Sequence, residues 1–371
     1  MIGMKQIFGT DRIRASVGEL VPEDRVDRTK DVLQHGDLLF ARQSLTFEGA
    51  GKCSIFESSD EDCTWESHLI RAQLDPRLAN PLFFYYYFAS DMGRRNMSTI
   101  ITQVAAAGVK GTDLSKLLVP LPPLNVQAGV AEVLGALDDK IAANERLSGA
   151  VQDLLQERFA LLRLDGFTGD GSFLTVSDLF DVNPRTSQKL AGQAPYLGMK
   201  DLPDSSMTVG SWSTREAKSG ARFINGDVLL ARITPCLENG KAGYVDFLEN
   251  TEVGVGSTEF IVFRARSPLL SAVPFFLTKS ERFRDFAIKH MQGTSGRQRL
   301  AAADVADYRL AKVDDESLNR FGELSMSLLK RVKTAVSESR ALARTRDELL
   351  PLLMNGKITV KDAEAVVSDA V

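Results

Sequence analysis

Two long segments of the chain, 123–163 and 315–353, repeat apolar residues with the alternating 4,3 spacing of a heptad pattern. The seam positions are 126, 130, 133, 137, 140, 144, 147, 151, 154, 158 and 161 in the first segment, and 318, 321, 325, 328, 332, 335, 339, 342, 346, 349 and 353 in the second. Eight of the eleven are apolar in each segment, so each segment is predicted to be a helix with one seam that must be buried. We expect the two helices to pair as a coiled coil, with the polar seam residues Lys140 and Asn144 fixing their register. The alternative is that both helices only line a globular core.

The chain ahead of each long helix alternates short apolar runs with Gly, Asp, Asn and Pro. Runs typical of strands are Leu38–Phe40, Val228–Ile233 and Phe260–Phe263. Two further stretches, Pro81–Met97 and Pro274–His290, favour helices. This alternation predicts mixed α/β (α+β) domains.

An internal repeat relates the two halves of the chain. MIGMK at 1–5 returns as YLGMK at 196–200, and GDLLFAR at 36–42 returns as GDVLLAR at 226–232. EGAGKCSIF at 48–56 and SHLIRAQ at 67–73 likewise resemble ENGKAGYVDF at 238–247 and EFIVFRA at 259–265. Four pairs in one order indicate a tandem duplication with a period near 190 residues. We predict a first domain at 1–120, a long helix at 121–165, a second domain at 166–311, a second long helix at 312–359 and a tail at 360–371.

A duplicated unit that pairs its helices about a pseudo-two-fold axis must run them antiparallel. The two domains are then expected at opposite ends of a rod of about 60 Å, since 40 residues rise about 1.5 Å each. One turn of B-DNA measures about 34–36 Å. The predicted spacing therefore suits two domains that contact sites one to two turns apart on one duplex.

Composition is that of an ordinary globular protein, with 371 residues, 44% apolar and 25% charged. The formal net charge is −4, from 45 Lys and Arg against 49 Asp and Glu, which argues against a protein that simply coats DNA. No apolar run approaches the roughly 18 residues of a membrane span. The three cysteines, Cys53, Cys63 and Cys236, are few and irregularly spaced, so we expect a reducing, cytoplasmic location.

Catalytic motifs are not evident in the sequence. The GAGK stretch at 49–52 lacks the Gly and Ser/Thr of a phosphate loop, because Thr46 and Cys53 stand at those positions. The three histidines (His35, His68 and His290) show no metal-ligand spacing with the cysteines. We therefore expect a chain without catalytic activity that binds no cofactor or metal itself.

Basic residues cluster between Lys279 and Arg299, with a local balance of +4. The GTSGRQR stretch at 293–299 combines Gly flexibility, hydroxyls, a Gln and two Arg, which suits a loop that enters a DNA groove. The matching place in the first repeat is 101–114. The alternative is a solvated helix face followed by a mobile loop. The candidate DNA contacts are Thr294, Ser295, Arg297, Gln298 and Arg299, then Lys110, Arg94 and Arg95, and behind them Lys200, Arg232 and Lys241.

VPLPPLNVQAGVAEVLGALDDKIAANERL at 119–147 closely resembles the central conserved region of type I restriction–modification specificity subunits. RTRDELLPLLMNGKI at 344–358 is similar to the C-terminal helix end of that family, and the stretches 226–245, 256–265 and GTSGRQRL resemble its target-recognition domains. The resemblance covers nearly the whole chain. It implies two target-recognition domains, each reading half of a bipartite asymmetric site in double-stranded DNA, with the helices as spacer and docking platform.

The same resemblance implies partners that carry the chemistry. Two adenine-methylating modification subunits would bring S-adenosylmethionine, and restriction subunits that translocate and cleave DNA would bring ATP and Mg²⁺. A rival interpretation is a scaffold of two duplicated domains that holds other proteins and does not bind DNA specifically. A third, a methyltransferase in its own right, would require this chain alone to bind S-adenosylmethionine.

One departure concerns the start of the first repeat. The second repeat begins upstream of YLGMK with 173–195, whereas the first begins at MIGMK, so about 20–30 residues have no counterpart. The tail after Lys357 does not resemble a displaced copy. We expect either a start codon assigned too late or a first domain that is natively trimmed.

Overall fold

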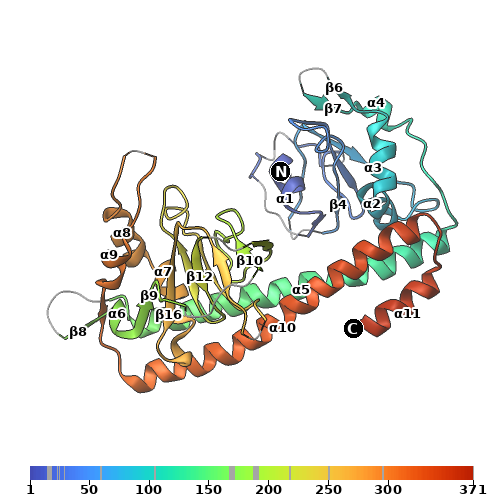
Figure 1. Ribbon diagram of the computed structural model, residues 1–371. Coiled ribbons are helices and arrows are strands. Elements are labelled where there is room, and N and C mark those ends of the chain that lie inside the picture. Colours follow the sequence, from blue (N-terminus) through green and yellow to red (C-terminus); the bar gives the residue numbers. More distant parts are fainter. Residues whose placement is uncertain are drawn as a thin grey trace. The chain divides into compact units, whose positions relative to one another are not determined.

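The computed structural model describes residues 1–371 except 15–18, 23, 25, 29, 59–60, 104–105, 167–171, 187–191, 217–218, 250, 295 and 371. The chain divides into two compact units, and Figure 1 labels their elements. The first unit comprises Met1–Ala142 with Glu338–Val371, and the second comprises Ala143–Ser337. Each unit thus contains a β-sheet domain together with one half of each of two long helices, α5 (Leu124–Leu162) and α10 (Asp315–Met354).

The domain of the first unit is built on a four-stranded sheet of order β1-β4-β2-β5, in which β1 is parallel to β4 and the other pairs are antiparallel. A small second sheet has the order β3-β7-β6. The strands are β1 (Arg12–Ile13), β2 (Leu38–Ala41), β3 (Gln43–Ser44), β4 (Cys53–Phe56), β5 (Leu69–Ala72), β6 (Thr102–Gln103) and β7 (Ala107–Gly108). The helices are α1 (Met4–Gly9), α2 (Pro81–Ala89), α3 (Asp91–Ser98), α4 (Gly111–Leu114) and, after α10, α11 (Val360–Ala370).

The domain of the second unit contains an antiparallel sheet of order β14-β13-β16-β9 and a mixed sheet of order β11-β10-β15-β12. A separate pair joins β17 to β8. The strands are β8 (Phe173–Thr175), β9 (Phe180–Val182), β10 (Gln193–Leu197), β11 (Ser213–Glu216), β12 (Ala221–Phe223), β13 (Val228–Ala231), β14 (Ala242–Tyr244), β15 (Gly254–Gly256), β16 (Phe260–Ala265) and β17 (Arg309–Ala311). The helices are α6 (Val176–Leu179), the 3₁₀ turn η2 (Pro268–Leu270), α7 (Val273–Lys279), α8 (Glu281–Lys289) and α9 (Ala302–Ala306).

The duplication is visible in equivalent bonds of the two units. In the first unit the carboxylate of Asp37 pairs with Arg71, joining the start of β2 to β5 (2.7 Å). In the second unit Asp227 pairs with Arg264, joining β13 to β16 (2.7 Å). Both carboxylates are 1% exposed, so each domain buries the same ion pair at the same place in its sheet.

Each predicted short helical stretch is in fact two helices. Ser90 separates α2 from α3, and its hydroxyl accepts a hydrogen bond from Gly93 N. Ser280 does the same between α7 and α8, accepting from Phe283 N. A serine side chain in this position accepts a hydrogen bond from a free backbone amide at the start of the next helix, so the chain can turn there without leaving that amide unbonded.

The long helices match the predicted heptad segments 123–163 and 315–353 to within one residue at each end, and they run antiparallel in each unit. In the first unit Asp138 of α5 pairs with Arg346 of α10 (2.6 Å). In the second unit Asn144 Nδ2 donates to the carbonyl of Ala335 (3.2 Å), and the rings of Phe159 and Phe321 are 6.0 Å apart. Positions on α10 fall as those on α5 rise, which confirms the antiparallel pairing.

The polar seam residues do fix contacts between the helices. Lys140 forms an ion pair with Glu338 (3.4 Å), and Asn144, 7% exposed, binds the α10 backbone. A buried amide that is satisfied in only one alignment disfavours the others. Both residues therefore contact the partner helix as expected, and their role in specifying the register stays a prediction.

The predicted seam of α5 is wrong in its second half. Leu147, Leu154 and Leu161 are 43%, 37% and 73% exposed, while Val151, Leu155 and Phe159 are buried. The buried positions there are spaced by four residues instead of alternating 4,3. The cause is the second domain, because Phe159 also packs on Phe276 of α7 (6.1 Å between ring centroids) and so draws the apolar face of α5 toward the sheet. The helices therefore both pair with each other and line the cores of the domains.

No helix among the described residues is long and apolar enough to cross a membrane.

Candidate nucleic-acid interface

The GTSGRQR stretch forms a tight hairpin between α8 and α9. Its base is the pair Gln292 and Arg299, whose backbone amides each donate to the other's carbonyl (2.9 and 2.8 Å). Gly293 and Gly296 take positive φ angles of 131° and 77°, which only glycine adopts readily. Thr294 lies exposed in the turn. Ser295, another predicted contact, lies outside the described residues.

Backbone bonds attach this hairpin to the end of β13. Thr234 N donates to the carbonyl of Gln298 (3.2 Å), and Gln298 N donates to Thr234 Oγ1 (3.2 Å). Leu300 N donates to the carbonyl of Arg232 (2.9 Å). The side chain of Gln298 is half-buried, so the sheet holds the base of the hairpin in place while its turn faces solvent.

The two arginines of the hairpin differ in their surroundings. Arg299 is ion-paired with Glu259, with its Nη2 2.8 Å from Oε1 and its Nε 3.0 Å from both oxygens. The hydrogen bond from Arg299 is the main cause that lowers the pKa of the Glu259 carboxyl, so the pair is charged at neutral pH. Arg297 is exposed, and its guanidinium has no ion pair among the described residues. Arg297 can therefore reach a ligand directly, whereas Arg299 must leave Glu259 or share it.

The first unit places a hairpin at the equivalent position. Strand β7 returns beside β6 and pairs with β3, and Val109 N donates to the carbonyl of Arg42 (2.8 Å) as Leu300 N does to Arg232. A groove of about 470 Å³ runs along this hairpin, lined by Arg42, Gln43, Thr102 and the stretch 106–112. Lys110 is exposed in this groove wall at the start of α4.

Two predicted contacts have structural bonds of their own. Arg94 is half-buried and donates from Nη2 to the carbonyls of Glu48 and Ala50 (2.7 and 3.1 Å), and burial lowers its pKa. Lys241 is 15% exposed, with its ammonium 2.9 Å from the carbonyl of Leu202. Each would have to give up these bonds to bind a ligand, although their role as contacts stays a prediction.

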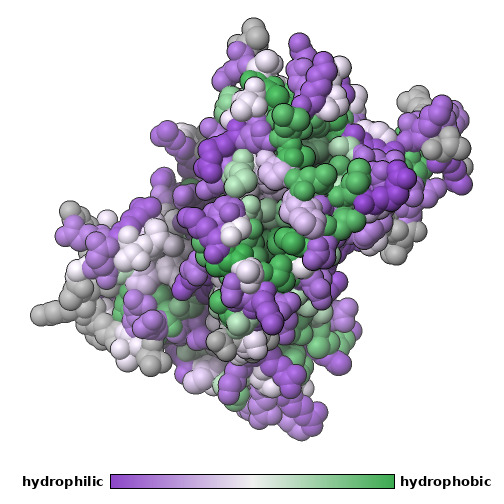
Figure 2. All heavy atoms as spheres, turned by 90° about the vertical axis from the view of Figure 1, so that its right-hand side faces the viewer, coloured by the Kyte–Doolittle hydropathy of each residue, from purple (hydrophilic) through white to green (hydrophobic). Residues whose placement is uncertain are grey.

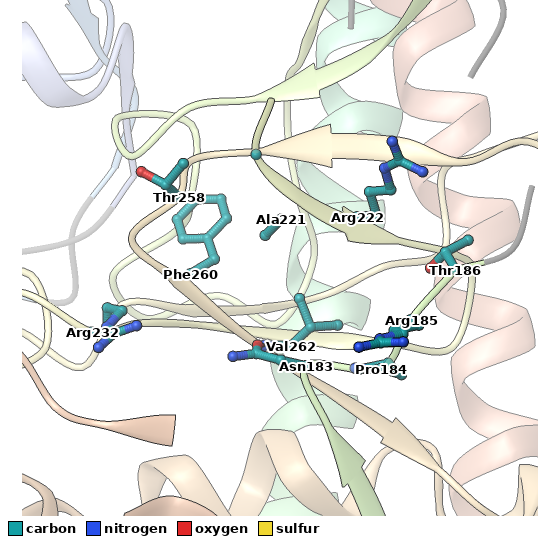
Figure 3. A pocket seen from close by; sticks show the side chains of 11 residues that line it. Asn183, Pro184, Arg185, Thr186, Ala221, Arg222, Arg232, Thr258, Phe260 and Val262 are labelled. Atoms are coloured by element: carbon teal, nitrogen blue, oxygen red, sulfur yellow. Dashed lines mark hydrogen bonds between the residues drawn. The ribbon is translucent and has the colours of Figure 1, made fainter. Parts of the chain in front are cut away.

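The remaining predicted contacts are placed differently. Arg95 is exposed on α3, and Lys200 is exposed in the turn after β10. Arg232 is half-buried where β13 ends, at the edge of a groove shown in Figure 3. The structure thus brings Arg232 together with the hairpin of 292–299.

Sequence reasoning missed three arginines that line the two grooves. Arg42 is the counterpart of Arg232, and the alignment of GDLLFAR with GDVLLAR could have identified it. Arg185 and Arg222 line the groove beside Arg232 but belong to no motif, so nothing in the sequence singled them out. Among the described residues no three His, Cys, Asp or Glu side chains lie close enough together to hold a metal ion.

Comparison with known proteins gives matches to part of the chain. Residues 20–152 match the type I restriction modification DNA specificity domain. The chain is 30% identical over 134 residues to the EcoAI specificity subunit of a type I restriction enzyme from Escherichia coli, which covers 34% of this chain and 22% of that protein. It is 31% identical over 147 residues to the EcoKI specificity subunit of a type I restriction enzyme from Escherichia coli (strain K12), which covers 37% of this chain and 31% of that protein. The matched segments thus span less than a third of the length of these relatives.

The fold is that of a solved structure over almost its full length. The S subunit of a type I restriction–modification system from M. genitalium aligns with a TM-score of 0.54 and 15% identity, covering 92% of this chain and 88% of that chain. At this identity the likeness concerns the fold, which comprises two β-sheet domains and two long antiparallel helices.

Proposed function

We propose that the chain is a specificity subunit of the type I restriction–modification family, since residues 20–152 match the DNA specificity domain of that family, and that it reads a bipartite, asymmetric sequence in double-stranded DNA. In this proposal the chain performs no chemical step. It directs adenine methylation, and ATP-dependent cleavage, by partner subunits. Those partners would hold S-adenosylmethionine, ATP and Mg²⁺.

The observation that carries the proposal is the equivalent hairpin in each unit. Val109 bonds to Arg42 in one and Leu300 to Arg232 in the other, so two copies of one fold present a hairpin from the same place. The hairpins differ in sequence, with Arg297 and Gln298 in one and Lys110 beside the other. Two equivalent hairpins that carry different side chains suit the recognition of two different half-sites.

The proposed DNA contacts of first rank are Arg297, Gln298 and Arg299, with Thr294 and Ser295. Arginine can bind guanine O6 and N7 bidentately, glutamine can bind adenine, and hydroxyls and backbone amides suit phosphates. Lys110, Arg94 and Arg95 are proposed in the first unit, with Lys200, Arg232 and Lys241 after them. The mildly acidic net charge of −4 means that partner subunits would supply part of the phosphate neutralisation.

The helices offer a docking surface for a modification subunit. Leu154 and Leu161 of α5 and Leu324 of α10 are exposed in the second unit and line an open groove of about 610 Å³. In the first unit the chain's own helix α11 covers the start of α5, where Val360 lies so close to Gly129 that an added methyl group would approach it within 2.9 Å. An amphipathic helix of a partner could cover the second unit in the same way.

A second apolar surface lies on the first unit. Figure 2 shows apolar side chains gathered between polar ones on the side of the molecule that carries α3 and α4 in Figure 1. The segment that leads into α5 and the first turn of α5 together have four exposed apolar residues, which are Leu118, Leu121, Leu124 and Val126. One such surface on each unit supports the proposal that two modification subunits bind.

The decisive experiment is a map of adenine methylation in cells that co-express this chain with its modification subunit. We expect a split motif that disappears when the chain is omitted. Methylation that does not depend on the chain, or no sequence-specific methylation from a complex that assembles, would contradict the proposal and leave the scaffold interpretation.

A further inference from the structure

The second unit contains an open groove of about 530 Å³ whose charged lining is entirely basic. Arg185 follows β9, Arg222 lies in β12 and Arg232 follows β13, and no Asp or Glu is among the lining residues. Figure 3 shows the three arginines around a floor of Ala221, Phe260 and Val262. Three guanidinium groups without a carboxylate between them favour an anionic ligand.

Two buried polar atoms at this groove lack a hydrogen-bond partner among the described residues. They are Arg232 Nε and the hydroxyl oxygen of Thr186. Buried polar groups in folded proteins are nearly always bonded, so an unpaired donor at a cavity marks a place where a ligand or water completes the bond. Each of the two atoms can donate a hydrogen bond to an oxyanion in its own part of the groove, since Figure 3 shows Arg232 and Thr186 at opposite ends.

One acidic residue lies next to the groove lining in the sequence, and it already has an ion-pair partner. Glu259 follows Thr258 of the groove wall, and its carboxylate is ion-paired with Arg299. The charge of Arg232 contributes to the lowered pKa of Glu259, but the two form no ion pair among the described residues. Arg185 and Arg222 are exposed without an ion pair in the described part of the chain, so their charges are left available.

The groove adjoins the base of the hairpin of 292–299. The carbonyl of Arg232 accepts the hydrogen bond of Leu300, the residue directly after that hairpin. A DNA strand whose bases face Arg297 must carry its phosphates past the hairpin, and arginine binds phosphate oxygens by charge-assisted hydrogen bonds. We propose that Arg185, Arg222 and Arg232, with the Thr186 hydroxyl, bind successive phosphates of the DNA backbone beside the half-site read by the second unit. This inference rests on the proposed function and adds phosphate contacts to it.

The test is the salt dependence of binding by the full chain to a random-sequence 40-bp duplex, measured by fluorescence anisotropy. Each phosphate contact adds about 0.9 to the slope of log K against log salt. We expect Arg185→Gln, Arg222→Gln and Arg232→Gln each to lower the slope by about one and to weaken binding to all sequences alike. Arg232→Lys keeps the charge and should keep the slope. The matched control is Arg331→Gln on an exposed part of α10, which should behave as wild type.

A second measurement separates DNA phosphate from free phosphate. The thermal unfolding of wild type and Arg232→Gln is compared in sodium phosphate and in sodium chloride of equal ionic strength. We expect the phosphate-induced stabilisation to be smaller in the variant. Wild-type slope and affinity in all three groove variants would overturn the inference while leaving the proposed function standing. A wild-type chain that binds no duplex would instead overturn the proposed function, and phosphate stabilisation lost in Arg232→Gln would then assign the groove to free phosphate.

Discussion

The chemistry of individual residues is set by partners far away in the sequence. Arg297 and Arg299 are indistinguishable in the motif GTSGRQR, yet only Arg299 is ion-paired, with a carboxylate 40 positions earlier. Arg94 and Lys241, which looked like surface cations, bond to carbonyls of neighbouring loops. Residue type therefore identified basic candidates but could not say which are available.

Arg297→Ala and Arg299→Ala are each expected to cost about 1–3 kcal/mol of binding if these residues read bases. Specificity should relax at one position of the motif, which methylation mapping in cells detects. The Arg299 variant also leaves Glu259 unpaired near the DNA, so the double variant Arg299→Ala with Glu259→Gln serves as its control. Unchanged methylation at unchanged sites in both single variants would remove these residues from the interface.

The buried pair of Asp227 and Arg264 gives a prediction about stability. Asp227→Asn leaves a largely buried guanidinium without its carboxylate, so we expect a loss of about 3–5 kcal/mol in the free energy of unfolding. Asp37→Asn should cost a similar amount in the first unit, because Arg71 is placed equivalently. Urea unfolding measures both.

The control is Asp181→Asn, which breaks the ion pair with Arg266 between side chains that are each about half exposed. Exposed pairs contribute about 0–1 kcal/mol. A loss of stability in Asp227→Asn as small as in this control would show that burial does not make the Asp227–Arg264 pair important for stability.

At the scale of elements, periodicity predicted where the long helices begin and end but not which face each one buries. The seam of α10 is buried nearly throughout, because it faces α5 and the domains together. The face of α5 changes after Asn144, where Leu155 and Phe159 replace Leu154 and Leu161 as buried positions. A heptad count assumes one partner, and α5 has two.

Substitution of the exposed leucines of α5 is expected to weaken binding of the modification subunit with little effect on folding. Leu154→Ser with Leu161→Ser should destabilise the chain less than a truncation in the core does, since the two side chains are 37% and 73% exposed. The same variant should bind the purified modification subunit more weakly in analytical size-exclusion chromatography, because it loses apolar surface that the partner would bury.

Leu155→Ala is the matched control on the same helix. Its side chain is fully buried, so truncation should destabilise the chain itself by about 2–5 kcal/mol. Unchanged assembly of the Leu154 and Leu161 variant would show that the partner binds elsewhere.

At the scale of the whole molecule, duplication gives each unit its own sheet, buried ion pair and hairpin. The two hairpins rest on equivalent backbone bonds but carry different side chains. Half-site recognition should therefore be separable between the units.

Replacing Thr294–Gln298 by a Gly-Ser segment of equal length should make one half of the methylated motif degenerate and leave the other half unchanged. The reciprocal replacement of 102–106 in the first unit should affect only the other half. Methylation mapping with an assembled complex decides the outcome. Loss of both halves together from a folded complex would mean that the two units do not read DNA independently.

Local information sufficed for the long helices, the duplication and the α/β character of the domains, because periodicity and repeated strings such as GDLLFAR and GDVLLAR are properties of the chain itself. It also placed the hairpin of 292–299 among the candidates. Contacts between distant residues decided the rest. Three features belong to this group: the rotation of the α5 seam, the pairing of Arg299 with Glu259, and the groove that Arg185, Arg222 and Arg232 line together. Each depends on contacts between segments that are distant in the sequence, so no local pattern encodes it.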